Sequence, residues 1–109
     1  MQKTTTNLDE ATEQIKEDLN NNSVLLYMKG NKLAPQCGFS AQVVSILDQL
    51  DVAYETRDIL LDEYLRQAIK DYSDWPTLPQ LYVNNTFIGG CDIVTELFEN
   101  GELKTLIKA

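Results

Sequence analysis

Two cysteines, Cys37 and Cys91, are the side chains of this sequence best suited to covalent chemistry. Cys37 follows a predicted loop and opens a predicted helix, where unpaired backbone amides and the helix dipole stabilise a thiolate over a thiol. Lys29, at the end of the preceding strand, adds a positive charge, and Ser40 can donate through its amide or hydroxyl. Gly38 lets another molecule approach the backbone closely. A lone cysteine is commonly a small buried hydrophobe, and we interpret Cys91 so, but these neighbours favour a functional thiol at Cys37.

The spacing of the two cysteines limits which thiol chemistry the chain can perform. A dithiol oxidoreductase needs a second cysteine at position 40, where this sequence has Ser40. Cys37 therefore cannot close a local disulfide, and a redox cycle must use an external thiol or the distant Cys91. A 2Fe–2S centre takes four ligands, whereas one chain offers at most two thiolates. Two copies that each contribute Cys37, together with two small-molecule thiols, would complete such a set.

Two further motifs could bind a peptide-like ligand. A cis peptide bond before Pro79 would turn the backbone groups of Leu78 outward beside the cysteine loop, open to an extended peptide. A trans proline in an ordinary loop is the alternative. Gly89-Gly90 leads into a predicted helix, whose first amides can bind a carboxylate while Asp92 receives an ammonium group. A plain hairpin exit, with Asp92 as the N-cap, fits the same residues.

The charge balance of the chain disfavours several classes of partner. Its 109 residues carry 9 Lys plus Arg against 17 Asp plus Glu, a net charge of −8, and no histidine. A negative surface disfavours nucleic acid and anionic membranes, and the missing histidines remove the commonest general base and metal ligand. Two cysteines are too few for a secreted disulfide scaffold or a four-ligand zinc site. With no apolar signal core and no membrane-length run, we expect a soluble cytoplasmic domain; a mature mitochondrial or plastid-matrix form is the alternative.

Acidic residues are absent between Asp18 and Asp48, a stretch that contains Lys29, Lys32 and Cys37. One interpretation is that a buried strand and one helix face need few charges. The other is an electropositive pocket inside an acidic protein. The residues alone leave both interpretations open.

Hydrophobic periodicity predicts a single domain, residues 1–109, of the α/β class. Thr6 or Asn7 caps a first helix, whose apolar face holds Leu8, Ala11, Ile15 and Leu19. The remaining predicted elements are a buried strand at 24–28, a loop at 29–36, a helix at 37–50, a strand at 53–59, a helix marked by Leu61, Leu65, Ala68, Ile69 and Tyr72, irregular chain at 75–79, a hairpin at 80–88, a helix from Cys91 or Asp92, and a short helix at 102–109. The first two strands should be parallel because a helix connects them, and the hairpin adds an antiparallel part. We therefore expect a four-stranded mixed sheet with helices on both faces.

Four motifs together resemble a known family. They are Met28-Lys29-Gly30, Cys37-Gly38-Phe39-Ser40, Trp75-Pro76-Thr77-Leu78-Pro79-Gln80 and Gly89-Gly90-Cys91-Asp92. Their order and approximate spacing are similar to those of the monothiol glutaredoxins of the Cys-Gly-Phe-Ser class, over about residues 8–107. The length resembles that of the single-domain bacterial and organellar members. The resemblance implies a thioredoxin-like fold and glutathione as cofactor.

The resemblance also implies roles for individual residues. Cys37 would be the active thiolate, which bonds the sulfur of glutathione or ligates iron. Lys29 and Arg66 would pair with the glycyl carboxylate of glutathione. One departure precedes the cysteine, because Gln36 stands where several relatives carry Lys or Arg, and this change would slightly weaken thiolate stabilisation.

The other end of glutathione is assigned by the same resemblance. Leu78, before an expected cis Pro79, would bind the tripeptide backbone. Cys91 and Asp92 would hold the γ-glutamyl end. Trp75 distinguishes this class from the dithiol glutaredoxins, and we expect its indole to shape the groove.

The resemblance favours an iron–sulfur carrier as the function. Two protomers and two glutathiones would hold one 2Fe–2S cluster through Cys37 of each chain and pass it to apo-proteins, with BolA-type proteins as hetero-partners and no nucleic-acid or membrane partner. The rival is a glutathione-dependent thiol–disulfide oxidoreductase that removes glutathione from mixed disulfides, with Cys37 as nucleophile. Ser40 weighs against an efficient reductase because it removes one reductive route, so we expect at most weak enzymatic activity.

Overall fold

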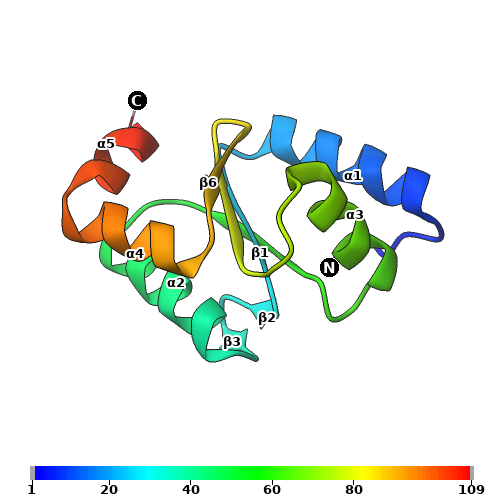
Figure 1. Cartoon of the computed structure of the whole chain (residues 1–109), viewed down its shortest axis with the longest axis horizontal. Helices are drawn as coiled ribbons and strands as arrows, with labels where there is room; N and C mark the ends of the chain where they lie inside the picture. Colours follow the sequence, from blue (N-terminus) through cyan, green and yellow to red (C-terminus); the bar gives the residue numbers. More distant parts are fainter. Residues whose placement is uncertain (1, 109) are drawn as a thin grey trace.

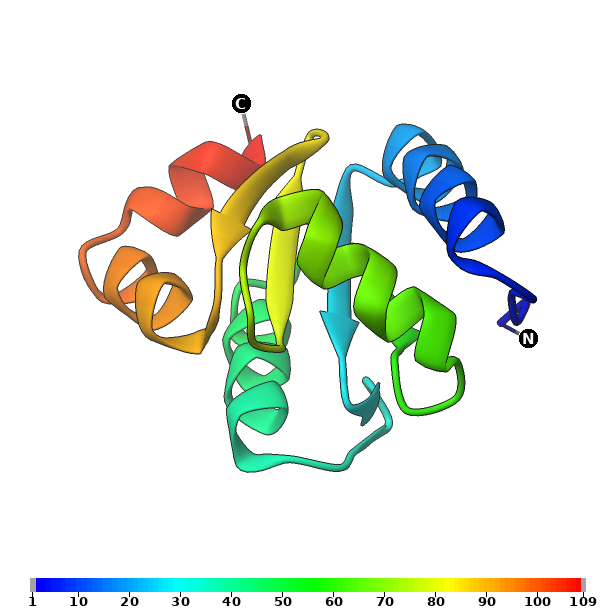
Figure 2. The same cartoon turned by 45° about the vertical axis from the view of Figure 1, so that its right-hand side comes forward.

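A mixed sheet of four strands forms the centre of the protein, with helices packed on both of its faces (Figure 1, Figure 2). The structure, a computed structural model, describes residues 2–108. Its elements are α1 (Leu8–Asn21), β1 (Val24–Met28), β2 (Gly30–Asn31), β3 (Ala34–Pro35), α2 (Gly38–Gln49), β4 (Glu55–Asp58), α3 (Glu63–Ser73), β5 (Gln80–Val83), β6 (Thr86–Gly89), α4 (Cys91–Glu99) and α5 (Glu102–Lys108). Within residues 2–108, no helix is both long enough and apolar enough to cross a membrane.

The strands of the main sheet follow the spatial order β4-β1-β5-β6. Strand β1 runs parallel to β4, with Leu25 opposite Glu55, and antiparallel to β5, with Leu25 opposite Tyr82. Because α2 connects β1 to β4, the predicted parallel pairing across a helix is confirmed. Strands β5 and β6 form the predicted hairpin, and its turn residues Asn84 and Asn85 have φ angles of 50° and 65°, which asparagine tolerates well.

Strand β1 is buried on both faces, which explains its uninterrupted apolar sequence. Leu25 and Tyr27 pack into a core with α1 and α3, whereas Leu26 and Met28 pack into a second core with α2, α4 and α5. The same division of the helices between the two sides of the sheet is visible in Figure 1. The two cores hold the strand from both sides and so determine where its carboxyl end lies.

Side-chain caps determine where two of the helices begin. Asn7 Oδ1 accepts from the amide of Glu10 at 2.8 Å, so the second of the two predicted candidates caps α1. Asp62 caps α3 by accepting from the amide of Leu65 at 3.0 Å. The buried Asp62 carboxylate also accepts from the amide and the hydroxyl of Thr5, at 2.7 and 2.8 Å, which ties the N-terminal segment to α3.

Three residues that the periodicity assigns to apolar helix faces are exposed instead. Leu8, Leu61 and Tyr72 are 45%, 62% and 41% exposed. Leu8 is the first residue of α1, and Leu61 precedes the Asp62 cap, so neither lies within a full helical turn against the core. Tyr72 lies in the last turn of α3, where its ring reaches only the margin of the core, 6.4 Å from the ring of Tyr82.

The predicted loop at 29–36 contains a small ribbon, because β2 and β3 pair antiparallel. The side chain of Asn31 accepts from the amides of Leu33 and Ala34, at 2.9 and 3.1 Å, which closes the turn of the ribbon. Strands of two residues are too short to produce an alternating pattern, so periodicity could not indicate them.

The hydroxyl of Tyr27 is buried and has no hydrogen-bond partner among the described residues, although its ring packs edge-on against Tyr82. An unsatisfied buried hydroxyl costs roughly 1–3 kcal/mol. We expect Tyr27→Phe to raise the free energy of unfolding by about 1 kcal/mol in urea denaturation. Tyr82→Phe is the matched control and should lower stability, because the Tyr82 hydroxyl donates to Gln80 Oε1 at 3.1 Å. Equal destabilisation by both substitutions would contradict this account.

Candidate functional site

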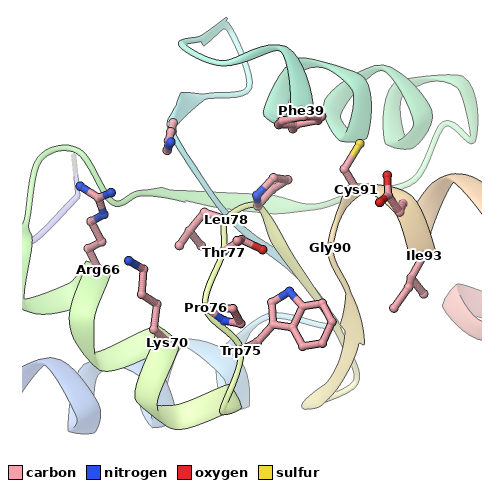
Figure 3. Close-up of a pocket in the computed structure, with 13 residues that line it drawn as sticks. Phe39, Arg66, Lys70, Trp75, Pro76, Thr77, Leu78, Gly90, Cys91 and Ile93 are labelled. Atoms are coloured by element: carbon pink, nitrogen blue, oxygen red, sulfur yellow. The ribbon is translucent and has the colours of Figure 1, made fainter.

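A cavity of about 420 Å³ lies near the carboxyl end of β1, between α3 and the first turn of α4 (Figure 3). The residues that line it are Lys29, Phe39, Arg66, Lys70, Trp75, Pro76, Thr77, Leu78, Pro79, Gly90, Cys91, Asp92 and Ile93. All of the site residues predicted from the sequence are among them except Cys37. The fold therefore brings together residues from five separate parts of the chain: the end of β1, the start of α2, α3, the segment 75–79 and the start of α4.

Cys37 is the N-cap residue of α2, next to the unpaired amides of the first helical turn. The nearby backbone amides of Ser40 and Phe39 favour the charged sulfur and hold the pKa of the thiol below its usual value. The charge of Lys29 and the hydroxyl of Ser40 lower this pKa further, while partial burial acts in the opposite direction. The neighbouring Phe39 lines the cavity, so the half-buried thiol lies beside the cavity rather than in its wall. These contacts agree with the thiolate stabilisation that the sequence predicts.

Ser40 ties the cysteine helix to the end of β1. Its side chain is fully buried, and its Oγ accepts from the amide of Lys29 at 3.2 Å. The carbonyl of Lys29 in turn accepts from the amide of Gln36 at 2.9 Å, so both ends of the cysteine loop are held to the same residue. Packing does not require glycine at position 38, because a Cβ there would meet no atom within 4 Å. The same open space leaves the first turn of α2 accessible.

Three cations line the cavity: Lys29 follows β1, and Arg66 and Lys70 belong to α3. None of the three makes an ion pair within residues 2–108, so their charge is available to an anionic ligand. Arg66 and Lys70 are four residues apart and project from the same side of α3 (Figure 3). Lys70 is absent from the predicted set, although its spacing from Arg66 is a signal that could have identified it.

Both interpretations of the acid-free stretch between Asp18 and Asp48 find support in the structure. It contains the fully buried β1, and it also supplies Lys29 to the cavity. A carboxylate from outside the stretch does reach this region, because Asp58 Oδ1 accepts from the amide of Gly30 at 3.0 Å. The Asp58 carboxylate accepts a hydrogen bond from the backbone at the start of β2 and does not line the cavity.

The segment 75–79 forms one wall of the cavity. The peptide bond between Leu78 and Pro79 is cis, as the resemblance implies. The side chain of Leu78 is anchored in the core with α1 and α3, so Leu78 can offer a ligand mainly its backbone groups. Trp75 packs against Phe87, with 6.0 Å between ring centroids, and its indole borders the groove as expected (Figure 3).

The first turn of α4 forms the opposite side of the cavity. Gly90, rather than Asp92, is the N-cap residue, and it has no side chain to bind the first amides of the helix, which therefore remain open to an anionic group. Gly89 has a φ angle of 152°, and a Cβ there would lie 2.8 Å from the Cβ of Ile93, so this position requires glycine. Cys91 packs against the core with α2 and α4, which agrees with its interpretation as a packing residue.

Metal binding by one chain alone does not fit the described residues. Within residues 2–108, no three His, Cys, Asp or Glu side chains are arranged to hold a metal ion, and both cysteines are free thiols. A 2Fe–2S cluster needs four ligands. The site can therefore contribute to such a cluster only if other molecules supply most of the ligands.

We expect iodoacetamide alkylation of Cys37 to show a pH midpoint below that of cysteine in an unfolded peptide of the same sequence. The measurement uses a Cys91→Ser background, which leaves one thiol. Ser40→Ala should raise the midpoint, because it removes a hydroxyl that stabilises the thiolate. The pKa of Cys37 is lower in the folded chain than in the unfolded chain. Ionisation of Cys37 therefore stabilises the fold at a pH above its pKa in the unfolded chain, and this stabilisation is lost as the pH falls through its pKa in the folded chain. An unchanged midpoint in Ser40→Ala would show that the hydroxyl has no such role.

The sequence is similar to those of known proteins along most of its length. Residues 24–88 match the glutaredoxin family. The monothiol glutaredoxin ycf64-like protein of Synechocystis is 55% identical over 87 residues, which cover 80% of this chain and 81% of that protein. The probable monothiol glutaredoxin 2 of Rickettsia conorii is 50% identical over 95 residues, which cover 87% of this chain and 89% of that protein.

The likeness extends to a solved structure. The solution structure of reduced poplar apo GrxS14 superposes with a TM-score of 0.82 at 44% identity, and the match covers 92% of each chain. The mixed sheet with helices on both faces is therefore the thioredoxin-like fold of the glutaredoxins. With Cys37 at the start of α2 and serine in place of a second cysteine at position 40, the chain belongs to the monothiol glutaredoxin family.

Proposed function

We propose that the cavity binds glutathione and that Cys37 acts together with the glutathione thiol. Glutathione is a tripeptide with two carboxylates, one ammonium group and one thiol, so it is anionic at neutral pH. The cavity presents three cations on one side and the open amides of α4 beside Asp92 on the other. Its volume of about 420 Å³ falls in the range of small-ligand sites. This distribution of charge is the observation that carries the proposal.

The charges favour one orientation of the tripeptide. The glycyl carboxylate would lie among the three cations, and the γ-glutamyl carboxylate would accept from the first amides of α4. The ammonium group would then lie beside Asp92, the peptide backbone would follow Leu78, and the thiol would point toward Cys37. The reversed orientation would place an ammonium group among three cations, which costs electrostatic energy.

We further propose that the protein carries a 2Fe–2S cluster as cargo and delivers it to apo-proteins. Cys37 is a partly exposed thiol with a lowered pKa beside a cavity of suitable size for glutathione, and the described residues contain no cluster of three or more His, Cys, Asp or Glu side chains that could hold a metal by itself. Two copies of the chain with two glutathiones supply four sulfur ligands. Because glutathione is held by noncovalent contacts, two of these ligands can dissociate, and the thiolates of a recipient protein can replace them.

The chain's own residues contribute to this function in two ways. The amides and hydroxyl that lower the pKa of Cys37 favour the thiolate, which is the form that ligates iron. Lys29, which follows β1, and the two cations of α3 would hold glutathione, so they would govern how readily the cluster is released. The homodimer, BolA-type proteins and apo iron–sulfur proteins are the partners that this proposal requires.

The lowered pKa of Cys37 also favours a second candidate, glutathione-dependent oxidoreductase activity. The Cys37 thiolate would attack the glutathione sulfur of a protein mixed disulfide, and the protein thiolate would leave. A second glutathione thiolate would then attack the same glutathione sulfur, releasing glutathione disulfide and restoring the Cys37 thiolate. Ser40 cannot take part as a resolving thiol, so the cycle depends on external glutathione throughout.

Reconstitution under anaerobic conditions distinguishes these two functions. With iron, sulfide and glutathione, we expect a coloured dimer by visible absorption and size-exclusion mass. Omitting glutathione, or introducing Cys37→Ser, should leave a colourless monomer because ligands are lost. Cys91→Ser should keep the colour, because Cys91 packs against the core.

Two outcomes would contradict this account. A colourless monomer with rapid activity on a glutathione mixed disulfide would establish the oxidoreductase as the main function. Loss of the cluster in Cys91→Ser would show that this residue does more than pack.

The proposed orientation predicts a specific effect of the cavity cations on glutathione affinity. Arg66→Gln should raise the glutathione dissociation constant about fivefold in calorimetric titration at low salt, and the effect should shrink at high salt. Lys104→Gln is the matched control, because it removes the same charge from an exposed position on α5. Equal weakening by both substitutions would mean that net charge, and not the cavity cations, governs binding.

A further inference from the structure

Gln80 is a buried polar residue to which the proposed function assigns no role. It is the first residue of β5, where its backbone lies opposite Tyr27 of β1. Its fully buried side chain donates from Nε2 to the carbonyls of Trp75 and Thr77, at 3.3 and 3.2 Å. Its Oε1 accepts from the hydroxyl of Tyr82 at 3.1 Å. The carboxamide thus joins the rigid sheet to the cavity wall formed by residues 75–79.

This wall has few other anchors. At its start, the amide of Trp75 donates to the carbonyl of Lys70 at 3.1 Å, and near its end the Leu78 side chain is buried in the core. The segment is neither helix nor strand, and its two prolines have no N–H to donate. Within residues 2–108, Gln80 provides the only donors to the carbonyls of Trp75 and Thr77. Between the two anchors, the carboxamide holds the backbone of the wall.

The two carbonyls determine which way the Gln80 carboxamide faces. Because carbonyls only accept, Nε2 faces them, and Oε1 accepts from the Tyr82 hydroxyl on the other side. A flipped amide would place Oε1 against two other acceptors and would lose both hydrogen bonds to the wall. The ring of Tyr82 is itself held between Tyr27 and Phe87, at centroid distances of 5.8 and 5.3 Å. Packing of Tyr82 in the core therefore holds the Gln80 carboxamide in place, with its Nε2 donor directed at the wall.

We propose that Gln80, held through its Oε1 by the Tyr82 hydroxyl, is a positioning residue that fixes the wall at 75–79 and thereby sets the affinity of the cavity for glutathione. The inference rests on the proposed glutathione binding. When the carboxamide is removed, the carbonyls of Trp75 and Thr77 lose their donors, and because both residues are exposed, the backbone of the wall can turn these carbonyls toward water. The wall then moves more freely in the absence of ligand, and binding must order it at an entropic cost. Affinity falls although every residue that lines the cavity is still present.

The test uses the double variant Gln80→Met/Tyr82→Phe. It keeps the volume of both side chains and removes the Gln80 carboxamide together with the Tyr82 hydroxyl, so neither of these two groups is left buried without the other. The two wall carbonyls that lose their donor belong to exposed residues, and the fold should be retained. Trp75 is the only tryptophan of the chain and lies in the wall, so its fluorescence reports the wall directly. Acrylamide quenching of Trp75 without glutathione, calorimetric titration with glutathione and urea unfolding are measured on the same samples.

We expect quenching of Trp75 to increase and the glutathione dissociation constant to rise about tenfold, under conditions where the variant is fully folded. Tyr82→Phe alone should give a smaller change, because Gln80 Nε2 remains in place. Tyr27→Phe is the control, since it removes a neighbouring buried hydroxyl that has no part in these contacts, and it should change neither quenching nor affinity.

Each other outcome overturns a different part of the proposal. Unchanged quenching and unchanged affinity in the folded double variant would show that Gln80 does not position the wall, whatever its effect on stability. Increased quenching with unchanged affinity would show that the wall does not govern glutathione binding. If the unaltered chain binds no glutathione while quenching still increases in the variant, the hold of Gln80 on the wall is supported and the proposed ligand is wrong.

Discussion

Strand β1 is buried on both faces and hydrogen-bonded along both edges, and the site is built outward from its carboxyl end. The amide of Lys29 binds Ser40, which places the first turn of α2 and with it Cys37. The amide of Gly30 binds Asp58, which joins the start of the cysteine loop to the end of β4. A slip of β1 by one residue would turn its apolar side chains to the opposite faces, so the two cores that fix the strand also fix the position of the sulfur.

An anion site in a protein of net charge −8 depends on the short range of electrostatic interactions in salt solution. At physiological ionic strength, exposed charges more than about 8 Å apart are largely screened. The three cavity cations therefore act on a bound ligand more strongly than the acidic residues on distant surfaces, such as Asp9 and Glu10 in the first turn of α1. The overall charge still acts against large polyanions, which would contact far more of the surface than the cavity.

Three of the buried polar side chains of this protein have the same structural role, because each satisfies backbone groups at a helix end or in a segment without regular structure. Ser40 binds the amide that follows β1, Asp62 binds the first turn of α3 and the N-terminal segment, and Gln80 binds two carbonyls of the cavity wall. A buried backbone group without a partner is costly, so irregular segments near a core need such side chains. The amide after β1, the start of α3 and the wall at 75–79 belong to segments that contribute to the cavity, whereas the N-terminal segment does not line it.

Local chemistry was enough to predict the main helices and strands, the buried strand at 24–28, a cap for the first helix at Thr6 or Asn7 and the activated thiol at Cys37, because apolar periodicity and helix ends depend on neighbours along the chain. The family resemblance assigned the other site residues, and all of these line the cavity. Only the tertiary structure decided that Leu61 is exposed and that the Gln80 side chain donates to two carbonyls of the wall. Each of these depends on which distant segments meet at a side chain, and packing between segments leaves little trace in a local pattern.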